Sequence, residues 1–82
     1  MKKLTLAQLE YGKVFTIGET PSYPKLRIPG GYLDMRDEII VKKEEIPFDI
    51  REMSDTEIAT QFQMTEEDTI DWRLGLSTKY IK

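Results

Sequence analysis

The spacing of hydrophobic residues along the chain changes once, at Ser54. Before this point, apolar and polar residues alternate over short stretches, as in the sequence Lys-Leu-Arg-Ile of residues 25–28. A period of two is typical of half-buried strands. After Ser54, apolar residues recur at spacings that fit helices. The pattern therefore predicts strands first and helices second.

Five short strands are predicted in the first part, preceded by a turn of α- or 3₁₀-helix. The strongest turn signal is Pro-Gly-Gly at residues 29–31, because glycine adopts the positive φ of a tight hairpin. A second turn is predicted at residues 19–24, which contain two prolines. The strands span about residues 13–18, 24–28, 32–35, 39–43 and 48–53. Short strands with tight connections favour a curled antiparallel sheet or a small SH3-like barrel.

The first helix is predicted from a capping box, Ser-Asp-Thr-Glu at residues 54–57, in which Ser54 and Glu57 satisfy each other's free amides. It spans about residues 55–62 and buries Ile58, Ala59 and Phe62.

The second helix follows Thr65, which is expected to cap it. Its apolar residues are Ile70, Trp72 and Leu74, and Gly75 is a typical helix stop. Residues 76–82 are then a tail, either an edge strand or a loose end.

The fold class predicted is α+β, with residues 1–82 as one domain. It consists of a β unit at about 4–53, a helical pair at about 54–75 and the tail at 76–82.

With no Cys and no His, the chain lacks the Ser-His and Cys-His nucleophile systems and thiolate metal sites. We therefore expect no catalytic residue, metal or cofactor, and no enzyme. No apolar run reaches the length of a membrane span, so we expect a cytoplasmic protein with no membrane partner.

Charge is distributed unevenly. Residues 1–54 contain nine basic and nine acidic residues, whereas residues 55–82 contain three basic and six acidic ones. All six of these acids lie between Asp55 and Asp71, with no base among them. A patch of this kind repels phosphate backbones and favours a basic partner. The alternative is a solvated helix face.

Residues 58–72 resemble the bacterial helix-turn-helix family. Ala59 is small where the first helix of that motif needs a small residue, and Thr65 caps the second helix. Apolar Phe62 and Met64 flank the turn, and Trp72 comes seven residues after the cap. The resemblance implies two helices joined by a short turn, and, if it extends to function, a DNA-binding regulator.

The sequence departs from that family at Gln63, where glycine is usual, and at Thr69, where an aliphatic residue is usual. The helix that would read DNA carries acids where arginine, lysine, asparagine and glutamine belong. These acids are Glu66, Glu67, Asp68 and Asp71. We therefore expect no duplex DNA binding, because such affinity depends on neutralising phosphates.

The function predicted is non-catalytic binding of another protein, one with a basic surface. The contact residues expected are Glu66, Glu67, Asp68, Asp71 and Trp72. Trp72 is either an exposed anchor with an acidic rim or a packing residue that holds the helices to the sheet. A small adaptor, or an inhibitor encoded by a phage or mobile element, fits the size and the charge distribution.

Two other functions remain open. The first is binding of single-stranded nucleic acid by aromatic and basic residues of the barrel, namely Tyr23, Lys25, Arg27 and Tyr32. The alternative for these residues is ordinary packing on a strand face. The second is a divergent helix-turn-helix regulator. Assembly of the chain with copies of itself also remains open.

Overall fold

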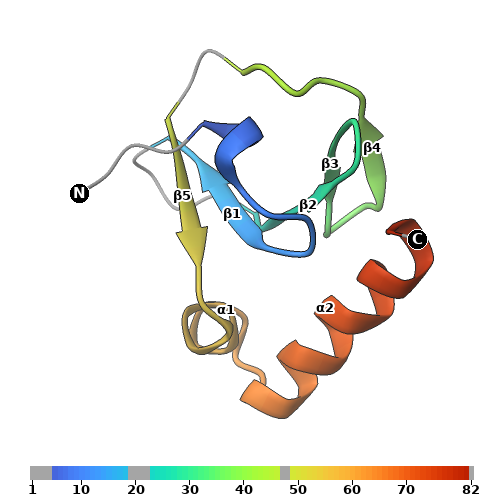
Figure 1. Ribbon diagram of the computed structural model, residues 1–82. Helices are drawn as coiled ribbons and strands as arrows, with labels where there is room; N and C mark the ends of the chain where they lie inside the picture. Colours follow the sequence, from blue (N-terminus) through green and yellow to red (C-terminus); the bar gives the residue numbers. More distant parts are fainter. Residues whose placement is uncertain (1–4, 19–22, 47–48, 82) are drawn as a thin grey trace.

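The computed structural model describes residues 5–18, 23–46 and 49–81. A 3₁₀ turn comes first, five strands follow, and two helices end the chain (Figure 1). The elements are η1 (Leu6–Gln8), β1 (Val14–Ile17), β2 (Lys25–Ile28), β3 (Gly31–Asp34), β4 (Ile39–Val41), β5 (Ile50–Met53), α1 (Asp55–Phe62) and α2 (Glu66–Tyr80). The α+β class and the strand-then-helix order are confirmed. The turn predicted at residues 19–24 lies outside the described residues except for its last two positions.

The strands form one antiparallel sheet in the order β4-β3-β2-β1-β5. Each strand from β1 to β4 pairs with the next along the chain, and β5 returns to pair with the other side of β1. The two ends of this order, β4 and β5, do not pair with each other among the described residues. The sheet is therefore open, and the closed SH3-like barrel is not observed.

One face of the sheet packs against the two helices. Its core contains Val14, Leu26 and Leu33 from the strands, Ile58 from α1 and Leu76 from α2. The helix α1 begins at the predicted capping box: the amide of Glu57 donates to Ser54 Oγ at 3.2 Å. Figure 1 shows both helices on the same side of the sheet.

The helix α2 does not stop at Gly75 but continues to Tyr80, so the predicted tail is wrong for residues 76–80. Glycine within a helix costs about 1 kcal/mol relative to alanine. Tertiary contacts beyond Gly75 offset this cost: Leu76 is 7% exposed in the core, and the side chains of Lys79 and Tyr80 hold Glu38. Packing therefore overrides the local stop signal.

The Glu38 carboxylate lies in the turn before β4 and ties that turn to the end of α2. Lys79 Nζ donates to Glu38 Oε1 at 3.2 Å, and the Tyr80 hydroxyl donates to the same oxygen at 3.0 Å. These two hydrogen bonds lower the pKa of Glu38 below its ordinary value of 4.5. The bond from Lys79 has the larger effect and that from Tyr80 the smaller one. The hydrogen bond between Lys79 and Glu38 also raises the pKa of Lys79.

The opposite face of the sheet is covered as well. Leu6 and Leu9, from η1 and the residue after it, pack with Phe15 of β1 and Ile50 of β5 into a second core. Consecutive residues of β1 are therefore buried on alternate faces: Phe15 is fully buried and Val14 is 1% exposed. The sheet is thus an inner layer, with helices on one side and the N-terminal turn on the other.

Arg27 lies inside this second core with only 2% of its surface exposed. Its guanidinium donates to the carbonyl oxygens of Leu6 at 3.0 Å, Ile28 at 2.7 Å and Gly31 at 2.9 Å. The carboxylate of Glu44 lies 3.6 Å away. A buried charge is tolerated only when hydrogen bonds and an opposite charge compensate it, and Arg27 has both.

Gly31 permits a close crossing of the chain. A Cβ atom at this position would lie 2.0 Å from the carbonyl oxygen of Val41 and 2.9 Å from the amide nitrogen of Lys43. The backbone that leaves β4 therefore passes directly over Gly31, where no side chain fits.

The role of Arg27 predicts that Arg27→Met destabilises the protein by about 2–4 kcal/mol, because three carbonyl oxygens lose a charged donor and Glu44 loses its partner. The free energy of unfolding in urea measures this. The matched control is Lys25→Met, which removes a cation from a less buried position of β2 and is expected to cost under about 1 kcal/mol. Equal effects of the two substitutions would contradict the structural role of Arg27.

The Glu38 contacts predict a pH dependence. Because its pKa is lowered, the contacts stabilise the fold above the ordinary pKa and are lost as the pH falls through the lowered value. In an NMR titration, the pKa of Glu38 is expected to lie below 4.5 and to rise towards it in Lys79→Met. The control Lys13→Met should leave it unchanged. An unaltered Glu38 pKa in Lys79→Met would show that the ion pair does not form in solution.

Candidate protein-binding surface

The first turn of α2 concentrates exposed acids. Thr65 caps the helix, accepting from the amide of Asp68 at 3.0 Å. Glu66, Glu67 and Asp68 follow directly, where the positive end of the helix dipole stabilises carboxylates. Glu66 also accepts a hydrogen bond from the hydroxyl of Thr56 on α1. The local structure therefore supports these acids without neutralising them.

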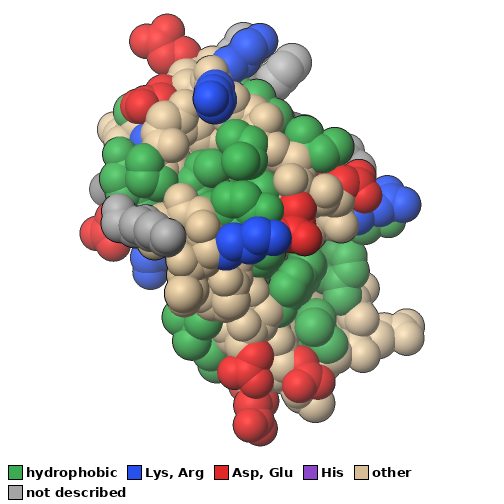
Figure 2. Space-filling view, turned by 90° about the vertical axis from the view of Figure 1, so that its right-hand side faces the viewer, with side chains coloured by type: hydrophobic (Ala, Val, Ile, Leu, Met, Phe, Trp, Pro, Cys, Tyr) green, Lys and Arg blue, Asp and Glu red, His purple; other side chains and the backbone are tan. Residues whose placement is uncertain are grey.

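The acids of α1 differ in having basic partners. Asp55 receives two hydrogen bonds from Arg73, at 3.0 and 3.2 Å, and Glu57 lies 3.5 Å from Arg51. Among the described residues, no such ion pair neutralises the four acids of α2, which are Glu66, Glu67, Asp68 and Asp71. Figure 2 shows red side chains gathered at the lower end of the molecule, where Figure 1 places the start of α2. This end therefore presents uncompensated negative charge.

The outer face of α2 combines two of these acids with apolar side chains. Glu67, Ile70, Asp71 and Leu74 follow one another at helical spacing, so they share one face. Ile70 is 36% exposed and Leu74 is 49% exposed. Two of the three apolar residues named for this helix are therefore exposed. We call these four residues the outer face of α2.

The inner face of α2 carries Thr69, Trp72 and Leu76. Thr69 is fully buried, and its hydroxyl donates to the carbonyl oxygen of Thr65 at 3.0 Å. The ring of Trp72 lies edge-on to Phe62 of α1, with 6.2 Å between centroids. Trp72 is therefore half-buried and packs α2 against α1, as in the packing alternative, whereas Ile70 and Leu74 are the exposed apolar residues of the helix.

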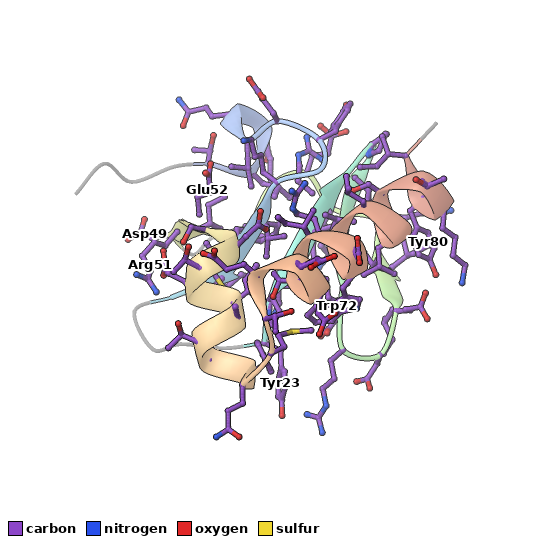
Figure 3. The ribbon with its side chains drawn as sticks, turned by 90° about the horizontal axis from the view of Figure 1, so that it is seen from below. Tyr23, Asp49, Arg51, Glu52, Trp72 and Tyr80 are labelled. Atoms are coloured by element: carbon purple, nitrogen blue, oxygen red, sulfur yellow. The ribbon has the colours of Figure 1, made fainter. Side chains whose placement is uncertain are left out.

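Tyr23 extends this aromatic row. Its ring centroid lies 5.9 Å from that of Phe62. The guanidinium carbon of Arg36 lies over the Tyr23 ring, 4.2 Å from its centroid; Figure 3 labels Tyr23. Tyr23 is 43% exposed. It therefore belongs to the helical side of the molecule.

Of the other predicted nucleic-acid residues, Arg27 and Tyr32 do not form a surface with Tyr23. Arg27 is buried and bonded as described above. Tyr32 is half-buried and packs edge-on against Phe15, 5.7 Å away, in the second core. Lys25 donates to the carbonyl oxygen of Tyr23 at 3.0 Å. Packing on a strand face therefore accounts for Arg27 and Tyr32.

The connection between the helices is short and tightly turned. Gln63 ends α1 in the left-handed conformation, with φ of 55° and ψ of 44°. This is the position where the helix-turn-helix family usually has glycine, so glutamine here takes up the conformation that glycine would. Thr69 is buried where an aliphatic residue is usual, because its hydroxyl is satisfied within the helix. Both departures are thus accommodated by the backbone.

In residues 5–18, 23–46 and 49–81, no group of three or more Asp, Glu, His or Cys side chains is placed to hold a metal ion. None of the helices in these ranges has the length and apolar composition needed to cross a membrane.

Comparisons with protein-family models, curated proteins and solved structures found no match to this chain. The candidate surface therefore rests on its own geometry and charge.

The two faces of α2 predict different responses to one substitution. Leu74→Gln should change the free energy of unfolding by less than about 0.5 kcal/mol, because the side chain is largely exposed. Leu76→Gln should cost about 2–4 kcal/mol, because it buries an amide in the core. Urea denaturation measures both. A larger cost at Leu74 than at Leu76 would place the outer face of α2 inside the fold.

Proposed function

We propose that this protein is a non-catalytic binding module that uses the outer face of α2 to contact a basic surface of another protein. The observation that carries the proposal is the exposure of Ile70 and Leu74 beside Glu67 and Asp71. Apolar side chains supply contact area, and the acids around them select the charge of the partner.

The cost of the acidic cluster supports this proposal. Glu67 and Asp71 are four residues apart on the helix, and like charges at this spacing cost roughly 0.2–0.5 kcal/mol. A face that served only solvation would do so equally well with mixed signs. Asp55 and Glu57 on the neighbouring helix have such basic partners. The two helices thus differ: the acids of α1 are paired with arginines, and those of α2 are not.

The same charges argue against reading duplex DNA with this helix. A recognition helix meets phosphates and base edges with its N-terminal residues. Here those residues are exposed carboxylates, which repel phosphate.

The proposal includes an SH3-like architecture. The strand order supports it, since pairing of β4 with β5 is the one step that would close the sheet into a barrel.

The test is the double substitution Glu67→Lys and Asp71→Lys. It removes the repulsion between residues 67 and 71 but also the favourable interaction of Glu67 with the helix dipole, so the thermal unfolding midpoint should change little. Association with the basic partner, captured by crosslinking and identified by mass spectrometry, should slow by about tenfold or more, because charges at an interface act mainly on the on-rate. Stopped-flow or surface-based kinetics measure this rate.

The matched control is Glu10→Lys with Glu45→Lys, which changes the net charge equally at exposed positions outside α2. It should slow association much less. If the double variant of α2 and this control behave alike, the acidic cluster is only a solvated face and the proposal fails.

A further inference from the structure

A groove of about 390 Å³ lies between α2 and the segment that leads into β1. Figure 1 shows both of its sides, the segment in blue and the C-terminal half of α2 in red. Pockets for small molecules usually measure about 300–1,000 Å³, so the groove falls at the lower end of this range. The segment contributes Tyr11, Gly12 and Lys13, and the helix contributes residues around Leu74 and Ser77. Of these, only Leu74 also belongs to the outer face of α2.

Both walls of the groove are held in place by the fold. The amide of Gly12 donates to the carbonyl oxygen of Arg27 at 2.8 Å, and the amide of Arg27 donates to that of Lys13 at 2.9 Å. The guanidinium carbon of Arg27 also lies over the ring of Tyr11, 4.9 Å from its centroid. On the opposite side, Leu76 anchors α2 in the core. The groove is therefore formed before any ligand enters it.

The floor of the groove contains a hydroxyl without a partner. Among the described residues, Ser77 Oγ is the one buried side-chain oxygen or nitrogen that forms no hydrogen bond. Gly12, with φ of 89°, leaves space beside it: a Cβ atom there would lie 3.8 Å from Ser77 Oγ and 3.9 Å from Ile81 Cδ1. Buried hydroxyls in folded proteins are nearly always hydrogen-bonded. A polar group that enters the groove from outside the chain is one source of the missing partner.

The side chains that line the groove include two cations and no acid. Arg73 is neutralised by Asp55, which accepts two hydrogen bonds from its guanidinium. Lys13 is exposed, and its side chain forms no hydrogen bond or ion pair with the described residues. The lining thus offers one uncompensated positive charge to a ligand.

Acids close to the groove limit the negative charge that it can accept. Asp71 lies one helical turn before Leu74, on the same side of α2. Glu10 precedes Tyr11 and is exposed. Both carboxylates would repel a second negative charge on a ligand. A single carboxylate therefore fits these surroundings better than a doubly charged phosphate.

We propose that this groove binds a small organic anion with one negative charge, a carboxylate carried on an apolar group. The carboxylate accepts from the ammonium of Lys13, and the apolar group lies against Tyr11, Leu74 and Ile81. An apolar lining with one well-placed charge is the usual composition of a small-molecule site. The site goes beyond the proposed function, because binding in the groove requires none of the acids of α2.

Benzoate tests the proposal, because it consists of a carboxylate on an apolar ring. Titrated into the full-length chain and followed by NMR, it should bind with a dissociation constant on the order of 1 mM and shift the amides of Gly12, Lys13 and Thr78 saturably. Two probes are matched to it: benzamide lacks the charge, and acetate lacks the ring. Each should bind about fivefold more weakly or worse.

Two substitutions at exposed positions separate the charge from the apolar contact. Lys13→Met should weaken benzoate about three- to fivefold, to the affinity of benzamide, and leave benzamide unchanged. Leu74→Gln should weaken benzoate and benzamide but not acetate. The control Lys42→Met removes an exposed cation beside β4 and should leave benzoate binding unchanged. Amide shifts far from the groove check that each variant keeps its fold.

Several outcomes would overturn the proposal. One is the lack of saturable shifts with benzoate up to about 20 mM, where a site with a 1 mM constant would be more than about nine-tenths filled. Another is equal affinity for benzoate and benzamide, and a third is an equal effect of Lys13→Met and Lys42→Met. The double variant Glu67→Lys with Asp71→Lys should still bind benzoate, so failure here is distinct from failure of the proposed function.

Discussion

The guanidinium of Arg27 places a full positive charge inside the second core. The β unit is arranged so that hydrogen-bond acceptors and an opposite charge surround it. Its acceptors come from Leu6, Ile28 and Gly31, so the N-terminal turn and the hairpin of β2 and β3 must meet around it. Glu44, from the segment after β4, supplies the opposing charge. Without these partners the charge would be too costly to bury. One side chain thus joins three parts of the chain: the N-terminal turn, the hairpin of β2 and β3, and the segment after β4.

A sheet covered on both faces leaves few surfaces for other molecules. The helices use their inner faces on the first core, which leaves the outer face of α2, and the strand order leaves the edge of β4. The acidic end and the β4 turn lie at opposite ends of α2, since Lys79 holds Glu38. Fifteen helical residues span roughly 22 Å. The acidic start of α2 and the β4 edge are therefore two separate surfaces.

The sequence was sufficient to predict the elements that local chemistry determines. The alternation in β2, the glycine turn before β3 and the capping box at Ser54 are all observed. It did not reveal that Arg27 is buried, because alternation assigns one face of a strand to solvent and cannot show that a distant turn covers it. Nor did it find the inner face of α2: Thr69 is polar, and its burial depends on a hydrogen bond to Thr65 that no apolar pattern records.

The candidate surface was predicted in part. The four acids of α2 lie together and exposed, as charge alone indicated. The sequence named Ile70, Trp72 and Leu74 as the apolar residues of α2 but did not show which of them face solvent, because residues two apart on a helix point in different directions. The true inner face is set by which side of α2 meets the sheet, through Leu76, and by the contact of Trp72 with Phe62.

The crossing at Gly31 limits how far β4 can extend. Because the backbone at Val41 and Lys43 passes over Gly31, the ladder between β3 and β4 ends at the pair Tyr32–Val41. An exposed apolar edge is a template for aggregation in proportion to its length and flatness. Here the edge ends after three residues, and two lysines follow. By turning the chain away at this point, a single missing side chain keeps an apolar edge too short to nucleate a growing stack of strands.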